Sequence, residues 1–265
     1  MDVKNWSVII TGGGTGVGAA AARKLAAMGA NLIINYSRSS AEAEAVAAEC
    51  RDLGVEAFAV QGDVAKDEDC NMLATTAIKK FGKIDGLLSN AGVTNFRGSD
   101  DFTGLTAEDF LNIYAVNVVG CFQMTRAVTP QMRQQGRGSV VMTSSIAGVM
   151  GVGSSIAYAA SKGALNTMTL SLARQLAPEI RVNAIAPGFI TGRWWQEKMG
   201  DEGYDKMVAG VEASTPLQHA GTPEDMAELA LFLLAGTVNI TGEVVISDAG
   251  MHLGAGTPIP QKPAQ

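Results

Sequence analysis

The sequence predicts a doubly wound α/β fold, in which a parallel β-sheet carries helices on both of its faces. Short apolar runs rich in β-branched residues alternate with longer stretches of helical periodicity, as is typical of strand–helix–strand units. A glycine-rich segment joins the first apolar run to the first helical stretch. Because neither a repeat nor a linker interrupts this alternation, we expect a single domain over residues 1–253. The proline-containing tail over residues 254–265 is expected to be poorly ordered or bound to a partner.

The composition argues against several classes of protein. The net charge is −6 and no run of basic residues is longer than two, which disfavours a nucleic-acid or anionic-membrane surface. The uncharged run over residues 139–161 is too rich in Ser and Gly for a membrane span. The 3 cysteines and 2 histidines lack metal-ligand spacing, and the N-terminus lacks the features of a signal peptide. We therefore expect reduced thiols, no metal site and a cytoplasmic protein.

The first unit consists of a strand, a glycine loop and a helix. We expect the strand at residues 7–10, the loop at 11–18 and an Ala-rich helix at 19–28 that Gly29 ends. Backbone N–H groups and the helix N-terminus bind phosphate in such an arrangement. A Walker A loop is disfavoured because Val17 and Gly18 replace its Lys-Ser/Thr ending, and the remaining alternative is an ordinary glycine turn. The candidate phosphate-binding residues are Gly12, Gly14, Thr15, Gly16, Val17 and Gly18.

The end of the second strand indicates which cofactor is bound. Residues 32–35 form this strand, and Ser37 and Arg38 follow it closely. Dinucleotide folds that select NAD usually have an acid here, whereas an arginine can pair with the 2′-phosphate of NADP. No acid occurs before Glu42, so we expect NADP(H) to be preferred. The alternative is a solvated Arg38 and loose selectivity, with NAD(H) accepted as well.

The alternation continues through the middle of the chain. Helices are expected at residues 41–53 and 67–81, the second with Asp67 as its N-cap, and strands at 56–60 and 84–88. Ligands of doubly wound sheets bind beyond the carboxyl ends of the strands. The segments that follow these two strands lie at that edge and contain Asp63, Val64, Asn90, Ala91 and Gly92.

A long helical pattern follows over residues 106–132, with Thr106 as its N-cap and Asp109 three residues later. Asn117 interrupts this pattern, and it is either an inward residue with a use for its amide or a residue on a wet face. The next strand is expected at residues 140–143, with Ser145 at its end. A helix over 156–176 follows, and Pro178 ends it.

Tyr158 and Lys162 are four residues apart in this last helix, so their side chains share one face. A nearby ammonium group favours the tyrosinate, which would let the hydroxyl exchange a proton with an alcohol or carbonyl oxygen near neutral pH. Ser145 follows the preceding strand and could hold that oxygen. The Tyr/Lys pair alone is a weak signal, because such pairs also arise by chance.

The last part of the chain contains a strand at residues 180–186, a helix that starts at Thr222 and Pro223, and a strand at 243–247. Residues 193–214 are irregular and carry Trp194 and Trp195. This segment is either an apolar lid over a substrate or an ordinary surface helix. Together with Phe96, the two tryptophans suggest an apolar or ring-bearing substrate.

Taken in order, these motifs resemble the short-chain dehydrogenases/reductases over residues 8–253, especially the branch with bacterial 3-oxoacyl-carrier-protein reductases. Each motif is weak alone, but their order and spacing together are specific. The resemblance implies a Rossmann-like fold and hydride transfer between a nicotinamide cofactor and a carbonyl or secondary alcohol. The matched elements are Thr11-Gly12-x-x-x-Gly16-x-Gly18, Asp63-Val64, Asn90-Ala91-Gly92, Asn117, Ser145, Tyr158-x-x-x-Lys162 and Pro187-Gly188.

The resemblance also implies roles for individual residues. Tyr158 would be the general acid or base, Ser145 would hold the substrate oxygen, and Lys162 would bind the nicotinamide ribose. Asn117 would help to keep a water that links Lys162 to solvent. Members of the family are commonly homotetramers, built partly on the helices that correspond to residues 106–132 and 156–176. The cofactor would be bound by the glycine loop (pyrophosphate), Asp63 and Val64 (adenine), Asn90, Ala91 and Gly92 (ribose side), and Pro187, Gly188, Ile190 and Thr191.

Two positions depart from the family pattern. The Thr that often follows the Pro-Gly glycine by four residues is Gly192 here, and Thr191 precedes it. The turn after the catalytic helix is Pro178-Glu179, which lacks the basic residue that docks an acidic carrier protein.

We therefore expect an NADP-dependent carbonyl reductase, or the corresponding alcohol dehydrogenase, that acts on a small molecule. The alternatives are an NAD-dependent alcohol dehydrogenase, a 3-oxoacyl-carrier-protein reductase and a non-catalytic dinucleotide-binding sensor or scaffold. The sensor is disfavoured because Ser145, Tyr158 and Lys162 are all present.

Overall fold

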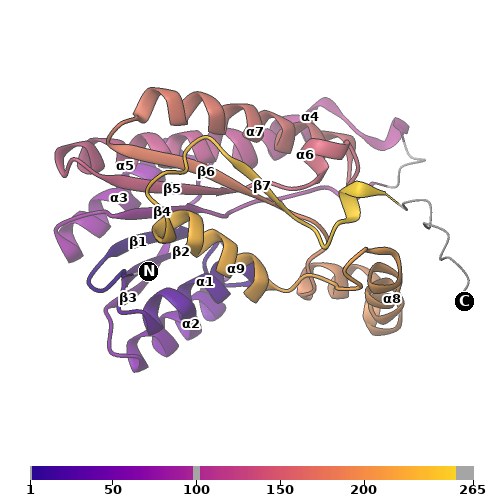
Figure 1. Cartoon of the computed structure of the whole chain (residues 1–265), viewed down its shortest axis with the longest axis horizontal. Helices are drawn as coiled ribbons and strands as arrows, with labels where there is room; N and C mark the ends of the chain where they lie inside the picture. The colour runs from indigo at the N-terminus through magenta and orange to yellow at the C-terminus, as the bar shows by residue number, and fades with distance from the viewer. Residues whose placement is uncertain (1, 98–101, 255–265) are drawn as a thin grey trace, which may run out of the picture.

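Seven strands form one parallel sheet in the computed structural model, which describes residues 2–97 and 102–254 (Figure 1). The order across the sheet is β3-β2-β1-β4-β5-β6-β7, which confirms the doubly wound, Rossmann-like fold. Strands β1, β2, β4, β5 and β6 are mostly buried, as expected of strands covered on both sides, and this explains their nearly continuous apolar runs; in the edge strand β3 only Ala57 is buried. The strands are β1 (Ser7–Thr11), β2 (Asn31–Tyr36), β3 (Ala57–Gln61), β4 (Gly86–Ser89), β5 (Gly138–Thr143), β6 (Ile180–Pro187) and β7 (Val244–Ser247).

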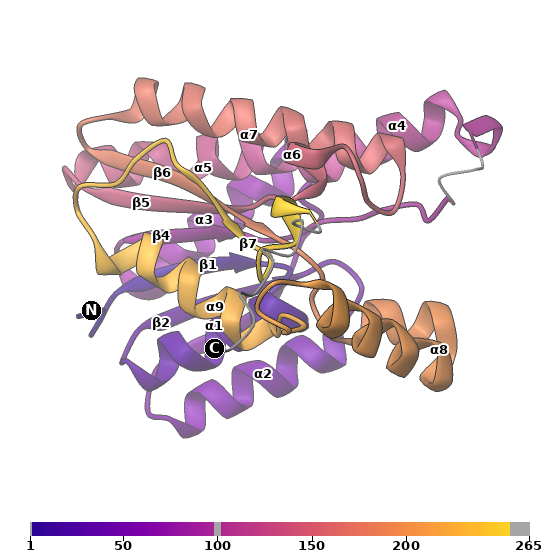
Figure 2. The ribbon, with the colours of Figure 1, turned by 45° about the vertical axis from the view of Figure 1, so that its right-hand side comes forward.

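Helices cover the two faces of the sheet in two groups (Figures 1 and 2). One group packs into a core with the inner side chains of β1 and β2, and consists of α1 (Gly16–Ala27), α2 (Ser40–Asp52) and α9 (Pro223–Leu231). The other group packs on the opposite face and consists of α3 (Asp67–Phe81), α5 (Cys121–Gln134) and α7 (Ile156–Leu176). The remaining helical segments are α4 (Ala107–Tyr114), α6 (Ala147–Met150), α8 (Arg193–Ser214), η1 (Phe102–Gly104), η2 (Ala115–Gly120), η3 (Phe232–Gly236) and η4 (Met251–Leu253).

Side-chain caps fix the starts of three helices. Thr106 and Thr222 each form a capping box with the Asp three residues later, at α4 and α9, and Pro223 occupies the first turn of α9. The Ser155 hydroxyl accepts a hydrogen bond from the Tyr158 amide at the start of α7. The caps predicted at Thr106 and Thr222 are confirmed.

Several predicted element boundaries are wrong, among them the start of the strand expected at residues 84–88, which begins at Gly86. The first helix begins at Gly16 rather than at residue 19, because the end of the glycine loop already has helical hydrogen bonding. Asp67 is the first residue of α3 and Lys66 is its N-cap; the Asp67 carboxylate instead pairs with Arg126 at 2.5 Å. The helix expected at residues 106–132 is α4, a π-helical segment η2, and α5, which ends at Gln134.

The three cysteines are reduced and buried, as predicted. Burial raises the pKa of Cys50 to about 11 and that of Cys70 to about 12, so both thiols stay neutral at physiological pH. Within residues 2–97 and 102–254, no helix is long and apolar enough to cross a bilayer. The predicted tail at 254–265 lies outside the described residues, apart from Gly254.

Candidate active site

Two adjoining cavities lie at the carboxyl edge of the sheet, where the strand order reverses between β1 and β4. This reversal is where ligands of doubly wound folds bind. The smaller cavity has a volume of about 270 Å³ and the larger one about 550 Å³. Gly12, Thr15, Ala91 and Gly92 line both, so a long ligand could extend from one into the other.

The glycine loop leaves the N-terminus of α1 available to an anion. Thr15 is the N-cap, but its side chain caps no backbone N–H, and the first turn contains no acidic residue. This contrasts with α4 and α9, whose Thr and Asp side chains use the same donors. Gly16 has a φ of +51°, and a Cβ built there would meet nothing within 4 Å. The orphan N–H groups and the open space fit a phosphate group.

Gly18 has a different task from the glycines before it. A Cβ at this position would lie 2.3 Å from the Gly12 carbonyl oxygen and 2.9 Å from Asn90 Nδ2. Gly18 lines neither cavity. It therefore allows α1 to pack closely against the loop, rather than contacting a ligand.

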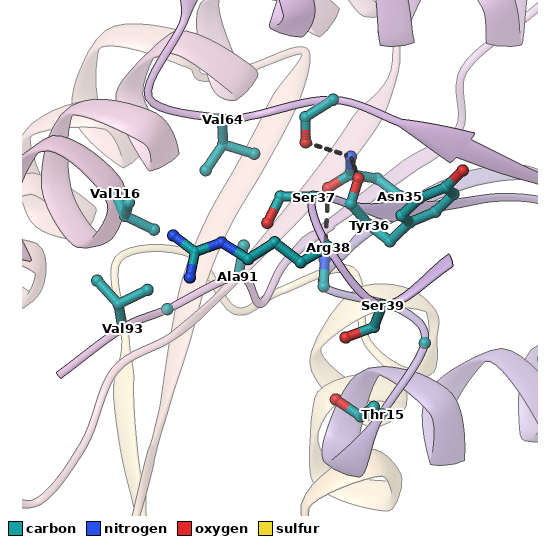
Figure 3. Close-up of a pocket in the computed structure, with 14 residues that line it drawn as sticks. Thr15, Asn35, Tyr36, Ser37, Arg38, Ser39, Val64, Ala91, Val93 and Val116 are labelled. Atoms are coloured by element: carbon teal, nitrogen blue, oxygen red, sulfur yellow. Dashed lines mark hydrogen bonds between the residues drawn. The ribbon is translucent and has the colours of Figure 1, made fainter. Parts of the chain in front are cut away.

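Arg38 lies in the smaller cavity, which 14 residues line (Figure 3). Its side chain extends across the cavity, with the guanidinium directed towards Val93 and Val116 (Figure 3). Ser37 lines the same cavity, and none of the 14 residues is acidic. The cavity thus offers one cation, two hydroxyl-bearing neighbours (Ser37 and Ser39) and apolar walls, which suits an adenosine that carries a phosphate.

A chain of hydrogen bonds joins the ends of three strands under the larger cavity. Asn90 Nδ2 donates to the carbonyl oxygens of Thr11 and Gly12, at 3.3 and 3.2 Å. Thr143 Oγ1 donates to Asn90 Oδ1 at 3.1 Å. The Thr143 carbonyl in turn accepts from Lys162 Nζ at 2.7 Å. These bonds tie the loops after β1, β4 and β5 to the buried lysine.

Tyr158, Lys162 and Ser145 all line the larger cavity. Lys162 is only 4% exposed, and its Nζ lies 5.5 Å from the centre of the Tyr158 ring. Ser145 Oγ accepts a hydrogen bond from the Ala147 amide at 3.1 Å, and this bond stabilises the turn between β5 and α6. The structure therefore brings Tyr158, Lys162 and Ser145 to the lining of one cavity, as expected from the helical spacing and the strand end.

Asn117 lies in η2 and is fully buried. Of the two predicted alternatives, an inward residue or a residue on a wet face, the first is therefore correct. Asn117 Oδ1 accepts from the Val93 amide at 2.8 Å, and its Nδ2 donates to the Val93 carbonyl and to Ser161 Oγ, at 3.0 and 3.1 Å. The side chain thus fixes the loop after β4 beside Lys162. It lines neither cavity, so the predicted water link through Asn117 stays a prediction.

The helix α8 borders the larger cavity instead of packing on the sheet. It projects beyond the carboxyl ends of the strands (Figures 1 and 2), has no buried residue, and lines the cavity with Trp194, Trp195, Met207 and Val211. The segment therefore lies over the cavity, where a lid would be expected, and its opening and closing over a substrate stays a prediction.

An ion pair ties α8 to α2 on the nucleotide side. Arg193 pairs with Glu42 at 2.7 Å and with Glu197 at 3.0 Å. The hydrogen bond from Arg193 lowers the pKa of Glu42 and raises that of Arg193. The start of the lid is thus anchored beside the second strand–helix unit.

Most of the predicted site residues line one of the two cavities, and three of them do not. Gly18, Asp63 and Asn117 lie outside the lining, and the Asp63 carboxylate caps the Ala65 amide at 3.1 Å. Thr143 and Met251 line the larger cavity and were missed, because nothing in the local pattern marks a strand-end threonine or a methionine after the last strand. The predicted residues that line a cavity are Gly12, Gly14, Thr15, Gly16, Val17, Ser37, Arg38, Val64, Asn90, Ala91, Gly92, Ser145, Tyr158, Lys162, Pro187, Gly188, Ile190 and Thr191.

The chain is similar to proteins of known name over nearly its whole length. Residues 12–252 match a family model described as enoyl-(acyl carrier protein) reductase. A Streptomyces violaceoruber protein, named as a ketoacyl reductase of the granaticin polyketide synthase, is 38% identical over 92% of this chain and 95% of its own. The 3-oxoacyl-[acyl-carrier-protein] reductase of Staphylococcus epidermidis is 33% identical over 94% of this chain and 100% of its own.

A solved structure shows the same similarity. The crystal structure of NAD⁺-bound xylitol dehydrogenase covers 93% of this chain and 98% of its own, with a TM-score of 0.84 and 31% identity. The residues that line the two cavities, from Gly12 to Met251, fall within the span matched by the family model.

Proposed function

Because the chain belongs to the short-chain dehydrogenase/reductase family of oxidoreductases, which act on carbonyl and alcohol groups, we propose that it transfers a hydride between NADP(H) and a carbonyl or secondary alcohol. One observation carries the proposal: Ser145, Tyr158 and Lys162 line one cavity that adjoins a second, Arg38-lined cavity without an acid. Reduction of a carbonyl by NADPH is the direction that we favour.

The residues present fit a dinucleotide. The uncapped N-terminus of α1 and the open space at Gly16 would take the pyrophosphate. Ser37 and Arg38 would hold the 2′-phosphate, and Lys162 would contact the nicotinamide ribose. When bound, the nicotinamide supplies the hydride for carbonyl reduction or accepts it in alcohol oxidation.

The chain's own residues handle the proton. The Tyr158 hydroxyl donates a proton to the substrate oxygen in reduction and removes it in oxidation. Ser145 Oγ donates a hydrogen bond to the same oxygen and so stabilises the negative charge that develops there. Lys162 Nζ, held by the Thr143 carbonyl, lies 5.5 Å from the centre of the Tyr158 ring. Asn117 acts as a positioning residue, because it holds the Val93 backbone beside this lysine.

The test combines one variant with two cofactors. Tyr158→Phe should lower turnover of carbonyl substrates by about a hundredfold or more, with the affinity for NADPH retained. Tyr114→Phe is the control, since Tyr114 lines neither cavity. Titrations that follow nicotinamide fluorescence should show NADPH bound about tenfold tighter than NADH, a difference of about 1.4 kcal/mol, and Arg38→Ala should remove most of that difference.

Two results would contradict parts of the proposal. A Tyr158→Phe enzyme with near wild-type turnover would exclude the tyrosine as the acid or base. Equal or tighter binding of NADH would favour an NAD-dependent alcohol dehydrogenase, the kind of cofactor that the xylitol dehydrogenase structure holds.

A further inference from the structure

A row of aromatic rings extends from Tyr158 along the wall of the larger cavity. Trp194 meets the Tyr158 ring edge to face, with centroids 6.5 Å apart and an angle of 79°. Phe96 meets Trp194 at 6.1 Å and 78°, and Trp195 at 5.3 Å and 67°. Phe189 continues the row at 5.6 Å from Trp195. All five residues line the cavity, and they come from four separate segments of the chain.

The edge-to-face geometry leaves ring surface open to a ligand. Trp194 is 49% exposed although it lies next to Tyr158. Aromatic rings prefer to pack edge to face or offset against other rings. The exposed indole surface therefore favours a flat or cyclic group close to the reacting carbonyl over a flexible linear chain.

Charges around the cavity favour an uncharged substrate. The charged residues in its lining are Lys162, Arg193 and Glu197. Lys162 is held by Thr143, and Arg193 pairs with Glu42 and Glu197. Lys198 is not in the lining, and its Nζ lies 5.6 Å from the centre of the Phe96 ring. Among the described lining residues, every cation is thus already occupied, while the remaining wall includes Val152, Phe189, Ile190, Met207, Val211 and Met251.

We propose that the substrate is an uncharged ketone, or the matching secondary alcohol, with a planar or cyclic group attached directly to the reacting carbon. Trp194 and Phe96 hold that ring beside the Tyr158 hydroxyl. Trp194 is the residue that sets the preference, because among the aromatic rings of the described residues it is the one paired with both Tyr158 and Phe96. This inference rests on the proposed function and narrows it to a substrate class.

Three methyl ketones of eight carbons separate shape from size: acetophenone, cyclohexyl methyl ketone and 2-octanone. With the preferred cofactor, both cyclic ketones should show a kcat/KM about tenfold or more above that of 2-octanone. Trp194→Ala should remove most of this preference, because it lowers kcat/KM for the two cyclic ketones much more than for 2-octanone. Met199→Ala is the matched control, since Met199 is exposed on the same helix and lines neither cavity. The anionic 4-acetylbenzoate should be about tenfold poorer than acetophenone.

The outcomes distinguish this inference from the proposed function. Equal or better use of 2-octanone, or a preference that survives Trp194→Ala, would overturn the substrate class while leaving the oxidoreductase chemistry in place. Efficient use of 4-acetylbenzoate would overturn the requirement for an uncharged ring. A second measurement needs no turnover: in calorimetry with Tyr158→Phe and NADP⁺, 1-phenylethanol should bind about tenfold tighter than 2-octanol. If 1-phenylethanol binds more tightly than 2-octanol but the wild type reduces none of the ketones, the proposed function is wrong and the binding site for a ring is still supported.

Discussion

At the scale of single residues, Gly16 is the position where a side chain would enter the space that we assign to the pyrophosphate. Its φ of +51° is left-handed, so any other residue is also strained there by about 1 kcal/mol. Gly54 has a φ of +89° with equally open surroundings, but it lies just after the C-terminal end of α2. A side chain is therefore strained at both glycines, but only Gly16 lines a cavity.

We predict that Gly16→Ala weakens NADPH binding by about tenfold or more, because the new methyl group occupies the phosphate site. Gly54→Ala should leave the affinity unchanged. Both variants should lose a similar free energy of unfolding, about 1 kcal/mol, measured by denaturant titration. If Gly16→Ala bound NADPH as tightly as the wild type, the pyrophosphate would have to lie elsewhere.

At the scale of secondary structure elements, helix starts differ in how they are stabilised. Thr222 and Asp225 form a capping box at α9, whereas Ser39 precedes α2 without a side-chain cap. The hydrogen bonds from His219 and Thr222 outweigh the effect of burial and lower the pKa of Asp225. The carboxylate therefore stays ionised, and the box intact, until the pH falls below the usual range for aspartate.

Thr222→Ala should lower the free energy of unfolding by about 1 kcal/mol, since it removes the acceptor for the Asp225 amide. Ser39→Ala should change it by less than about 0.5 kcal/mol, because no cap bond is lost. Urea titrations at neutral pH measure both. The Thr222→Ala deficit should shrink in acid, where protonation of Asp225 has already weakened the box; a deficit that is constant with pH would contradict this account.

The sheet and its long helices could be predicted because each is a local periodic pattern. The four-residue α6 could not, since Ala147–Met150 is too short to show a period. The π-helical η2 also packs closely against a distant part of the chain: a Cβ at Gly120 would lie 2.8 Å from Val64 Cγ2. The order of the strands also depends on contacts that no local pattern records.

The site divides in the same way. The glycine loop is one continuous segment, and Tyr158 and Lys162 are four residues apart in one helix. The sequence was therefore enough to predict that the members of each motif lie close to one another. The hydrogen bonds that Thr143 donates to Asn90, and that Lys162 donates to the Thr143 carbonyl, join residues 53 and 19 positions apart. Whether Asn117 faces inward or outward depended on the loop at Val93, 24 residues away, and so stayed open until the fold was known.

At the scale of the whole molecule, the helices α4, α5 and α7 carry several exposed apolar side chains. Leu111 and Phe122 are 70% and 41% exposed on α4 and α5, and Ile156 and Leu170 are 53% and 50% exposed on α7. Of these helices, α5 and α7 cover one face of the sheet, α4 contacts α7, and η2 contacts all three (Figures 1 and 2). Apolar patches of this kind usually mark an interface with another chain.

We predict that these helices form an interface in a homotetramer. Light scattering after gel filtration should give four copies of the 27.5 kDa chain, that is about 110 kDa. Phe122→Arg should reduce the mass to that of a dimer or monomer, because the arginine cannot leave water without an acidic partner. Leu53→Arg is the control: Leu53 is 53% exposed at the end of α2, on the opposite face of the sheet, and the change should leave the assembly intact. A wild-type mass of one chain would show that these helices stay exposed to solvent, and the tetramer prediction would be wrong.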